Sequence, residues 1–307
     1  MASGRTPCGI AIPQSNESAP VQAAFLQQFI KKVEPLGYDS LWVQEQIISD
    51  APILEPVTVL TYAAALTSQM RLGTSVLLTV IRNPVQLAKS LSSLDQLSQG
   101  RLTVGVGIGG PHAREEVFGV SSERRARQFV EGVQVMRTLW SQPLATFQGD
   151  FWKFEKVAME PKPIQKPLPV WFGARTPIGL KRTVRHADGW MGAGSSSSAD
   201  FVEHVQLLRQ YMDDAKRDPV TLPLSKRVYV AVATDKARAE RRLREWFAMR
   251  YKNADMAVRV SIWGSLAECT DKLGALVQAG AQHLLFNPVF DELEQAELFA
   301  KEIMPHL

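Results

Sequence analysis

Residues 101 to 110 read Arg-Leu-Thr-Val-Gly-Val-Gly-Ile-Gly-Gly, an apolar run that passes directly into glycines. The run Leu102–Val106 is typical of a buried β-strand, because it is short, apolar and bounded by glycine. A comparable strand that ends in glycine recurs at Pro169–Gly173. Glycine suits places where a ligand approaches the backbone closely or where φ is positive. The two stretches therefore predict a rim of strand carboxyl ends that holds a flat or phosphorylated ligand. The glycines of the first stretch are Gly105, Gly107, Gly109 and Gly110.

Short apolar strands alternate with amphipathic helical patterns along the rest of the chain. This alternation predicts repeated βαβ units, which form a parallel sheet. Eight strands of this kind favour an α/β fold of the closed (β/α)8 TIM-barrel type over a doubly wound sheet. The active sites of such barrels lie at the carboxyl ends of the strands. The predicted strands are Cys8–Ile12, Asp39–Val43, Arg71–Leu78, Leu102–Val106, Pro169–Gly173, Gly189–Ala193, Arg227–Val232 and His283–Phe286.

The longest interval between two predicted strands runs from about 111 to 168. It contains a predicted helix at about 124–140, an aromatic, hairpin-like piece at 147–154 and a proline-rich run. We interpret the interval as an insertion between strands 4 and 5, over the top of the barrel. Residues 1–307 are accordingly predicted to form one domain. The aromatic residues of the insertion either line an apolar substrate pocket or pack on the barrel.

Composition excludes several classes of function. The formal charge is +4 without any block of lysine and arginine, which argues against a nucleic-acid groove. Cys8 and Cys269 are isolated, and no histidines and carboxylates have metal-ligand spacing, so no disulfide framework and no metal site are predicted. Neither a signal peptide nor an apolar run long enough to span a membrane is present. We therefore expect a cytoplasmic protein with no membrane partner.

The segment Gly173-Ala174-Arg175-Thr176-Pro177 links a predicted strand to a predicted helix. Backbone N–H groups at the helix start, the Thr176 hydroxyl and the Arg175 guanidinium together could bind an anion. Proline suits the first helical turn, because the N–H that it lacks would have no helical partner there. The alternative is that Thr176 is a plain N-cap.

Two acidic or basic candidates follow strand ends. Glu45 lies between Gln44 and Gln46 after the second predicted strand, where carboxylate and amide groups could hydrogen-bond the edge of a heterocyclic ring. A solvated loop would explain these residues equally well. His112 follows the glycine-ended strand and is placed to act as a general acid or base. The alternative for His112 is an ordinary histidine on a surface loop.

The order and spacing of several motifs resemble the bacterial luciferase-like superfamily of flavin- and deazaflavin-dependent oxidoreductases. The similarity covers nearly the whole chain, from Gly9 to Pro288. The motifs are loose individually and specific together. They are Leu36-Gly-Tyr-Asp-Ser-Leu-Trp-Val43, Met70-Arg-Leu-Gly-Thr-Ser-Val-Leu77 with Arg82-Asn-Pro84, Leu94-Asp-Gln-Leu-Ser-Gln-Gly-Arg-Leu102, Glu115-Glu116 with Gly119, Pro161-Lys-Pro163, Pro169-Val-Trp-Phe-Gly173, Ala187-Asp-Gly-Trp190, Gly264-Ser-Leu-Ala-Glu268 and Ala279-Gly-Ala-Gln-His-Leu-Leu285.

The resemblance implies a TIM barrel with a flat isoalloxazine or deazaflavin ring across the strand ends. A non-prolyl cis peptide in the family matches the bond Ser75–Val76 of this sequence. The cofactor phosphate is then expected between two segments of backbone. The cofactor-binding residues predicted in this way, together with Gln46, are Ser75, Val76, Gly107, Ile108, Gly109, Gly173, Ala174, Arg175 and Thr176.

The same resemblance favours coenzyme F420 as the cofactor, with FMN as the alternative. It implies hydride transfer between F420 and a small organic substrate at the barrel mouth. The alternative is an FMN-dependent two-component monooxygenase that uses dioxygen and a separate reductase. A third hypothesis is a non-enzymatic relative. Relatives are often homodimers. The sugar-phosphate dehydrogenase branch has an Asp-His pair where this chain has Glu45-Gln46, and a catalytic glutamate where it has Gly110. These departures leave His112 or Glu45 as the predicted catalytic acid.

Overall fold

Eight parallel strands close into a barrel in the computed structural model, which describes residues 4–14, 22–110, 115–121 and 123–307. The strands follow one another around the barrel in chain order, and β1 pairs with both β2 and β12. This closure confirms the predicted (β/α)8 architecture. The barrel strands are β1 (Cys8–Ala11), β2 (Ser40–Val43), β3 (Arg71–Thr74), β5 (Leu102–Gly107), β8 (Val170–Gly173), β9 (Gly189–Gly192), β10 (Leu224–Val232) and β12 (His283–Asn287).

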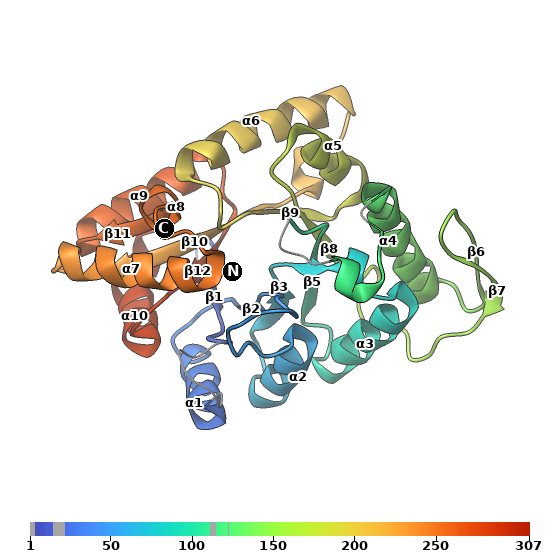
Figure 1. Cartoon of the computed structure of the whole chain (residues 1–307), viewed down its shortest axis with the longest axis horizontal. Helices are drawn as coiled ribbons and strands as arrows, with labels where there is room; N and C mark the ends of the chain where they lie inside the picture. Colours follow the sequence, from blue (N-terminus) through green and yellow to red (C-terminus); the bar gives the residue numbers. More distant parts are fainter. Residues whose placement is uncertain (1–3, 15–21, 111–114, 122) are drawn as a thin grey trace.

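Helices surround the barrel, as Figure 1 shows. Many of them begin at residues that satisfy the unpaired N–H groups of the first turn. Ser197 and Ser265 each form a capping box, and Asn83 and Thr176 accept hydrogen bonds from the first-turn amides that follow them. The helices of the outer layer are α1 (Ala23–Val33), α2 (Pro56–Leu66), α3 (Pro84–Leu97), α4 (Arg125–Ser141), α5 (Pro177–His186), α6 (Ser198–Asp214), α9 (Leu266–Ala279) and α10 (Glu292–Leu298).

Aromatic rings fill the interior of the barrel because facing strand positions are glycine. The Trp42 and Trp171 rings lie 5.8 Å apart, measured between centroids. A Cβ atom on Gly73 would lie 2.4 Å from the Trp42 ring, and one on Gly189 would lie 2.5 Å from Trp171. The His283 ring packs against both indoles, with centroids 5.4 and 6.0 Å away, and hydrogen-bonds two serine hydroxyls. The interior is thus a packed core, and the space for a ligand is at the strand ends.

The insertion between β5 and β8 contains α4 and a two-stranded hairpin, as predicted. The hairpin consists of β6 (Ala145–Gln148) and β7 (Lys153–Val157), which pair in antiparallel fashion. Figure 1 shows the hairpin at the periphery, beyond α4. The hairpin of the insertion therefore lies at the side of the barrel, whereas the sequence analysis placed the insertion over the top. Residues 111–114 and 122 of the insertion lie outside the described part of the chain.

Three further elements lie between β10 and β12 and were not predicted. They are α7 (Lys236–Tyr251), α8 (Met256–Val260) and β11 (Ser261–Gly264), and β11 extends the sheet by pairing with the second half of β10. The apolar part of β11 is only Ile262 and Trp263, too short a run to predict a strand from the sequence. The predicted third strand also differs, because it is divided into β3 and β4 (Leu77–Leu78). Across the described residues, no helix is both long and apolar enough to span a bilayer.

Candidate active site

The glycine-ended strands β5 and β8 are neighbours, so their carboxyl ends meet at one edge of the barrel mouth. Val76 occupies the space that two of these glycines leave. A Cβ on Gly107 would lie 2.7 Å from Val76 Cγ2, and one on Gly173 would lie 3.0 Å from Val76 Cγ1. Sequence analysis assigned this room to a ligand, whereas here a side chain of the protein fills it. Further along, Gly109 has φ of +85° and is exposed, and a Cβ on Gly110 would meet no atom of the described residues within 4 Å.

The peptide bond between Ser75 and Val76 is cis, as the resemblance implied. It separates β3 from β4 at the mouth of the barrel. The Ser75 amide donates to the Val43 carbonyl at 2.7 Å, and its own carbonyl accepts from Arg227 Nη1 at 3.3 Å. Ser75 is buried and Val76 is half-buried. Both residues therefore lie at the mouth, between the ends of β2, β5 and β10.

Thr176 caps α5, because its hydroxyl accepts a hydrogen bond from the Gly179 amide at 3.2 Å. The structure thus confirms that Thr176 is an N-cap, which was the alternative to a role in anion binding. It does not exclude an anion, since the first turn of a helix has several N–H groups without helical partners. Arg175 is exposed and donates to Ser195 Oγ at 3.3 Å. The half-buried Ala174 and Ile108 lie beside the strand ends.

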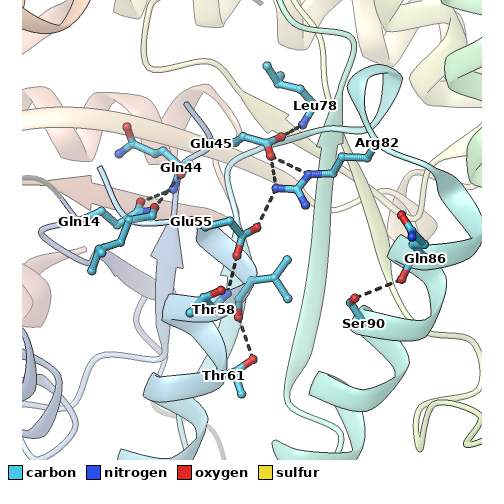
Figure 2. Close-up of polar contacts among 12 residues, drawn as sticks. Gln14, Gln44, Glu45, Glu55, Thr58, Thr61, Leu78, Arg82, Gln86 and Ser90 are labelled. Atoms are coloured by element: carbon cyan, nitrogen blue, oxygen red, sulfur yellow. Dashed lines mark hydrogen bonds and ion pairs between the residues drawn. The ribbon is translucent and has the colours of Figure 1, made fainter. Parts of the chain in front are cut away.

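The Glu45 carboxylate is fully buried in a network of hydrogen bonds, which Figure 2 shows. It accepts from the Leu78 amide and from the Arg82 guanidinium, with the Arg82 Nε–Oε1 distance at 2.7 Å. Arg82 also pairs with Glu55 at 2.7 Å. Burial raises the pKa of Glu45, although the adjacent Arg82 opposes that change. Because its oxygens are already engaged, Glu45 links the loop after β2 to β4.

The other candidates of the sequence analysis lie apart from this network. Gln46 is half-buried on the same loop. His112 is outside the described residues. The described residues contain no group of three or more histidines, cysteines or carboxylates that could hold a metal ion.

Arg227 is a site residue that sequence analysis missed. It extends from β10 into the mouth and donates to Asn287 Oδ1 at 2.8 Å and to the Ser75 carbonyl. The Tyr229 hydroxyl, two residues on, lies 2.5 Å from both Arg227 Nη2 and the Tyr251 hydroxyl. The sequence contains a signal for this arrangement. Ser225, Arg227 and Tyr229 alternate along one strand, so they point to the same side of the sheet.

Buried amides complete the polar lining of the mouth. Gln14 Nε2 donates to the carbonyls of Gln44 and Leu54 at 3.0 and 3.1 Å, and Gln44 Nε2 donates to Asn287 Oδ1 at 2.5 Å. Figure 2 shows Gln14 beside Gln44 on neighbouring strand ends. The mouth thus combines neutral amides, one buried guanidinium and exposed backbone, a set suited to binding a polar heterocyclic ring.

Comparison with known proteins gives matches along most of the chain. The model of a family described as luciferase-like monooxygenase matches residues 7–283. An uncharacterized protein of Mycobacterium tuberculosis is 40% identical over 166 residues, which cover 54% of this chain and 58% of that protein. The chain thus matches little more than half the length of that relative. The F420-dependent glucose-6-phosphate dehydrogenase of Kineococcus radiotolerans is 25% identical over 314 residues, covering 92% of each chain.

Among solved structures, an F420-dependent secondary alcohol dehydrogenase in complex with an F420-acetone adduct superposes with a TM-score of 0.86. The identity is 21%, and the match covers 98% of this chain and 99% of the other. At this identity the likeness establishes a common fold.

Proposed function

This chain belongs to the luciferase-like monooxygenase family, and from that premise we propose that it is an oxidoreductase that transfers a hydride between coenzyme F420 and a small organic substrate. The reaction would take place at the carboxyl ends of the barrel strands. The full-length similarity to an F420-dependent dehydrogenase supports F420 as the cofactor.

One observation of the structure carries the proposal. The ends of β5 and β8 lie side by side, and α5 starts directly after β8. The exposed Gly109, and Gly110, where a Cβ would meet no described atom, follow β5 on the same edge as the N–H groups and the positive dipole end of a helix. These features fit a cofactor phosphate between the segments Gly107–Ile108 and Gly173–Thr176, beyond the two glycines whose space Val76 fills.

The chain's own residues would then bind and orient the two reactants. Arg175, exposed at the start of α5, would add a charged donor to the phosphate. Ser75, Val76 and Arg227 would contact the ring, with Gln46 at its edge. When bound, the deazaflavin supplies a carbon that accepts or donates a hydride. Positioning would account for most of the catalysis, because Glu45 is held by Arg82.

The second candidate is an FMN-dependent monooxygenase, which the description of the matched family favours. It would need a partner reductase and dioxygen. Both candidates use the same mouth, so the cofactor itself distinguishes them.

Binding of the two cofactors tests the proposal. We expect purified protein to bind F420, measured by its fluorescence, and to bind reduced FMN at least tenfold more weakly. Addition of small alcohols to protein loaded with oxidised F420, or of small ketones to protein loaded with reduced F420, should change the absorbance of the deazaflavin. Tight binding of reduced FMN without binding of F420, together with oxygen consumption, would establish the second candidate instead.

A further inference from the structure

A surface groove of about 650 Å³ separates α4 from α5 and extends to the β6–β7 hairpin. Figure 1 shows these elements on one side of the barrel, away from α7 to α10. One wall is the outer face of α5. The opposite wall belongs to α4 and the hairpin, and apolar groups from both sides form part of the lining. These apolar residues are Val130, Phe147 and Ile178, of which Ile178 is 73% exposed.

Positive charge is concentrated on the α5 wall. Lys181, Arg182 and Arg185 all line the groove, and none of them forms an ion pair with any residue that the structure describes. The Lys181 ammonium lies 4.9 Å from the centroid of the Tyr211 ring, a contact that leaves its charge uncompensated. Burial together with Arg137, Arg185 and Arg182 lowers the pKa of the adjacent His186, consistent with a positive potential in this region.

The acidic groups of the opposite wall are already engaged by other donors. Asp150 accepts from Arg124 at 2.6 Å and from Arg127 at 2.7 Å. Glu131 is buried, and its carboxylate accepts the backbone amides of three consecutive hairpin residues, Asp150, Phe151 and Trp152. Neither carboxylate is available to the cations of α5, so the groove as a whole is positive.

A favourable effect on helix stability can explain the positions of only some of these cations. Arg185 and His186 lie in the last turn of α5, where a positive charge interacts favourably with the helix dipole. Lys181 and Arg182 lie in the middle of the helix, where that benefit is absent. Like charges three or four residues apart on one face of a helix slightly lower its stability. A bound anion would remove this destabilisation.

The groove starts where the proposed phosphate site ends. Its α4 wall follows β5 and its α5 wall follows β8, the two strands whose ends form that site. Ile178 is two residues beyond Thr176, and the three cations lie five, six and nine residues beyond it. At a rise of about 1.5 Å per residue, they lie about 7 to 14 Å further along the helix.

We propose that this groove binds the carboxylate-rich tail of the deazaflavin cofactor, through Lys181, Arg182 and Arg185. The inference rests on the proposed function. Coenzyme F420 continues beyond its phosphate into a lactyl group and γ-linked glutamates, whereas FMN ends at the phosphate. A chain of carboxylates that leaves the start of α5 would meet the three cations in succession.

The test compares two forms of the cofactor. The first is F420 with several glutamates, and the second keeps the phosphate and lactate but has no glutamate. We expect the wild-type protein to bind the first form more tightly. In the triple variant Lys181→Gln/Arg182→Gln/Arg185→Gln, affinity for the first form should fall about tenfold more than affinity for the second, which feels the lost charges only at a distance. Affinities are measured by fluorescence at low salt, where exposed charges act most strongly.

A matched control removes the same net charge elsewhere. Lys31, Arg241 and Lys272 are exposed, and their replacement by glutamine should leave both affinities unchanged. A γ-linked tetraglutamate peptide provides a readout that is independent of the ring. Calorimetry should detect its binding to the wild-type and control proteins, and no binding to the groove variant.

Failure of this inference differs from failure of the proposed function. If both cofactor forms bind with equal affinity to wild-type protein and groove variant, the tail lies elsewhere and the inference is wrong, whereas the proposed function stands. Binding of tetraglutamate without any difference between the two forms would assign the groove to an acidic segment of a partner protein, which also overturns the inference. If neither form binds, the proposed function itself fails.

Discussion

Acid should destabilise this protein through a histidine in the centre of the barrel. His283 is 8% exposed, packs against two indole rings, and hydrogen-bonds Ser40 Oγ at 3.0 Å and Ser225 Oγ at 2.7 Å. Burial lowers the pKa of His283 from 6.5 to about 4, with a small opposing effect of Asp39. The neutral ring is therefore the form that the folded state accommodates.

The sign and size of the effect follow from proton linkage. Between pH 6.5 and pH 4 the unfolded chain binds a proton at His283 that the folded protein does not bind, so stability falls as the pH falls through this range. Each pKa unit corresponds to about 1.4 kcal/mol, which gives a total of about 3 kcal/mol below pH 4. Between pH 7 and pH 5 the expected loss is about 2 kcal/mol.

Urea unfolding at pH 7 and at pH 5 measures this loss in wild-type protein, in His283→Gln and in the control His306→Gln. The exposed His306 should leave the pH dependence unchanged, whereas His283→Gln should lose about 2 kcal/mol less than wild type between the two pH values. His186 and His204, whose pKa values burial also lowers, contribute equally to all three proteins and cancel in the comparison. An equal loss in wild type and His283→Gln would refute the argument, as would an imidazole NMR titration of His283 near pH 6.5.

Two further substitutions test the packing and the polar network. Gly73→Ala would place a methyl group 2.4 Å from the Trp42 ring and should lower the free energy of unfolding by about 2 kcal/mol or more, whereas Gly274→Ala, in an open part of α9, should leave it unchanged or raise it by up to about 1 kcal/mol. Thermal and urea unfolding measure both, and equal effects would contradict the packing argument. Glu45→Gln should cost about 3 kcal/mol because it breaks a buried ion pair with Arg82, and the double variant with Arg82→Met should cost less than the sum of the single changes. Additive losses would show that the two groups act independently.

Much of the fold could be predicted from the chain because the signals were local. Each barrel strand is a short apolar run, and each is followed by a pattern with helical periodicity. The start of α5 was recognisable from Thr176-Pro177, since a cap and a proline act on the backbone beside them. β11 was not predicted, because its pairing with β10 depends on residues that are distant in the sequence.

The site was only partly predictable, for a related reason. The glycines at 107 and 173 indicated close approach to the backbone, but which atoms approach depends on the fold, and Val76 fills both places. Glu45 has the side chain of a possible catalytic acid, but Arg82, which is distant in the sequence, donates a hydrogen bond to its carboxylate. Arg227 begins a predicted strand directly after Lys226, and only the closed barrel brings it to Ser75 and Asn287.

By itself, the sequence determined the alternation of strands and helices, the closure that eight such units favour, and the edge of the barrel where glycines and a helix start coincide. These properties depend on periodicity and on backbone preference, which residues close in sequence determine. Only the tertiary structure decided which charges are paired. It joined Glu45 to Arg82, and it left Lys181, Arg182 and Arg185 of α5 beside a groove without an ion pair to any described residue. The physical reason is that charge pairing depends on distances in space, which residues far apart in the chain acquire only when the barrel closes.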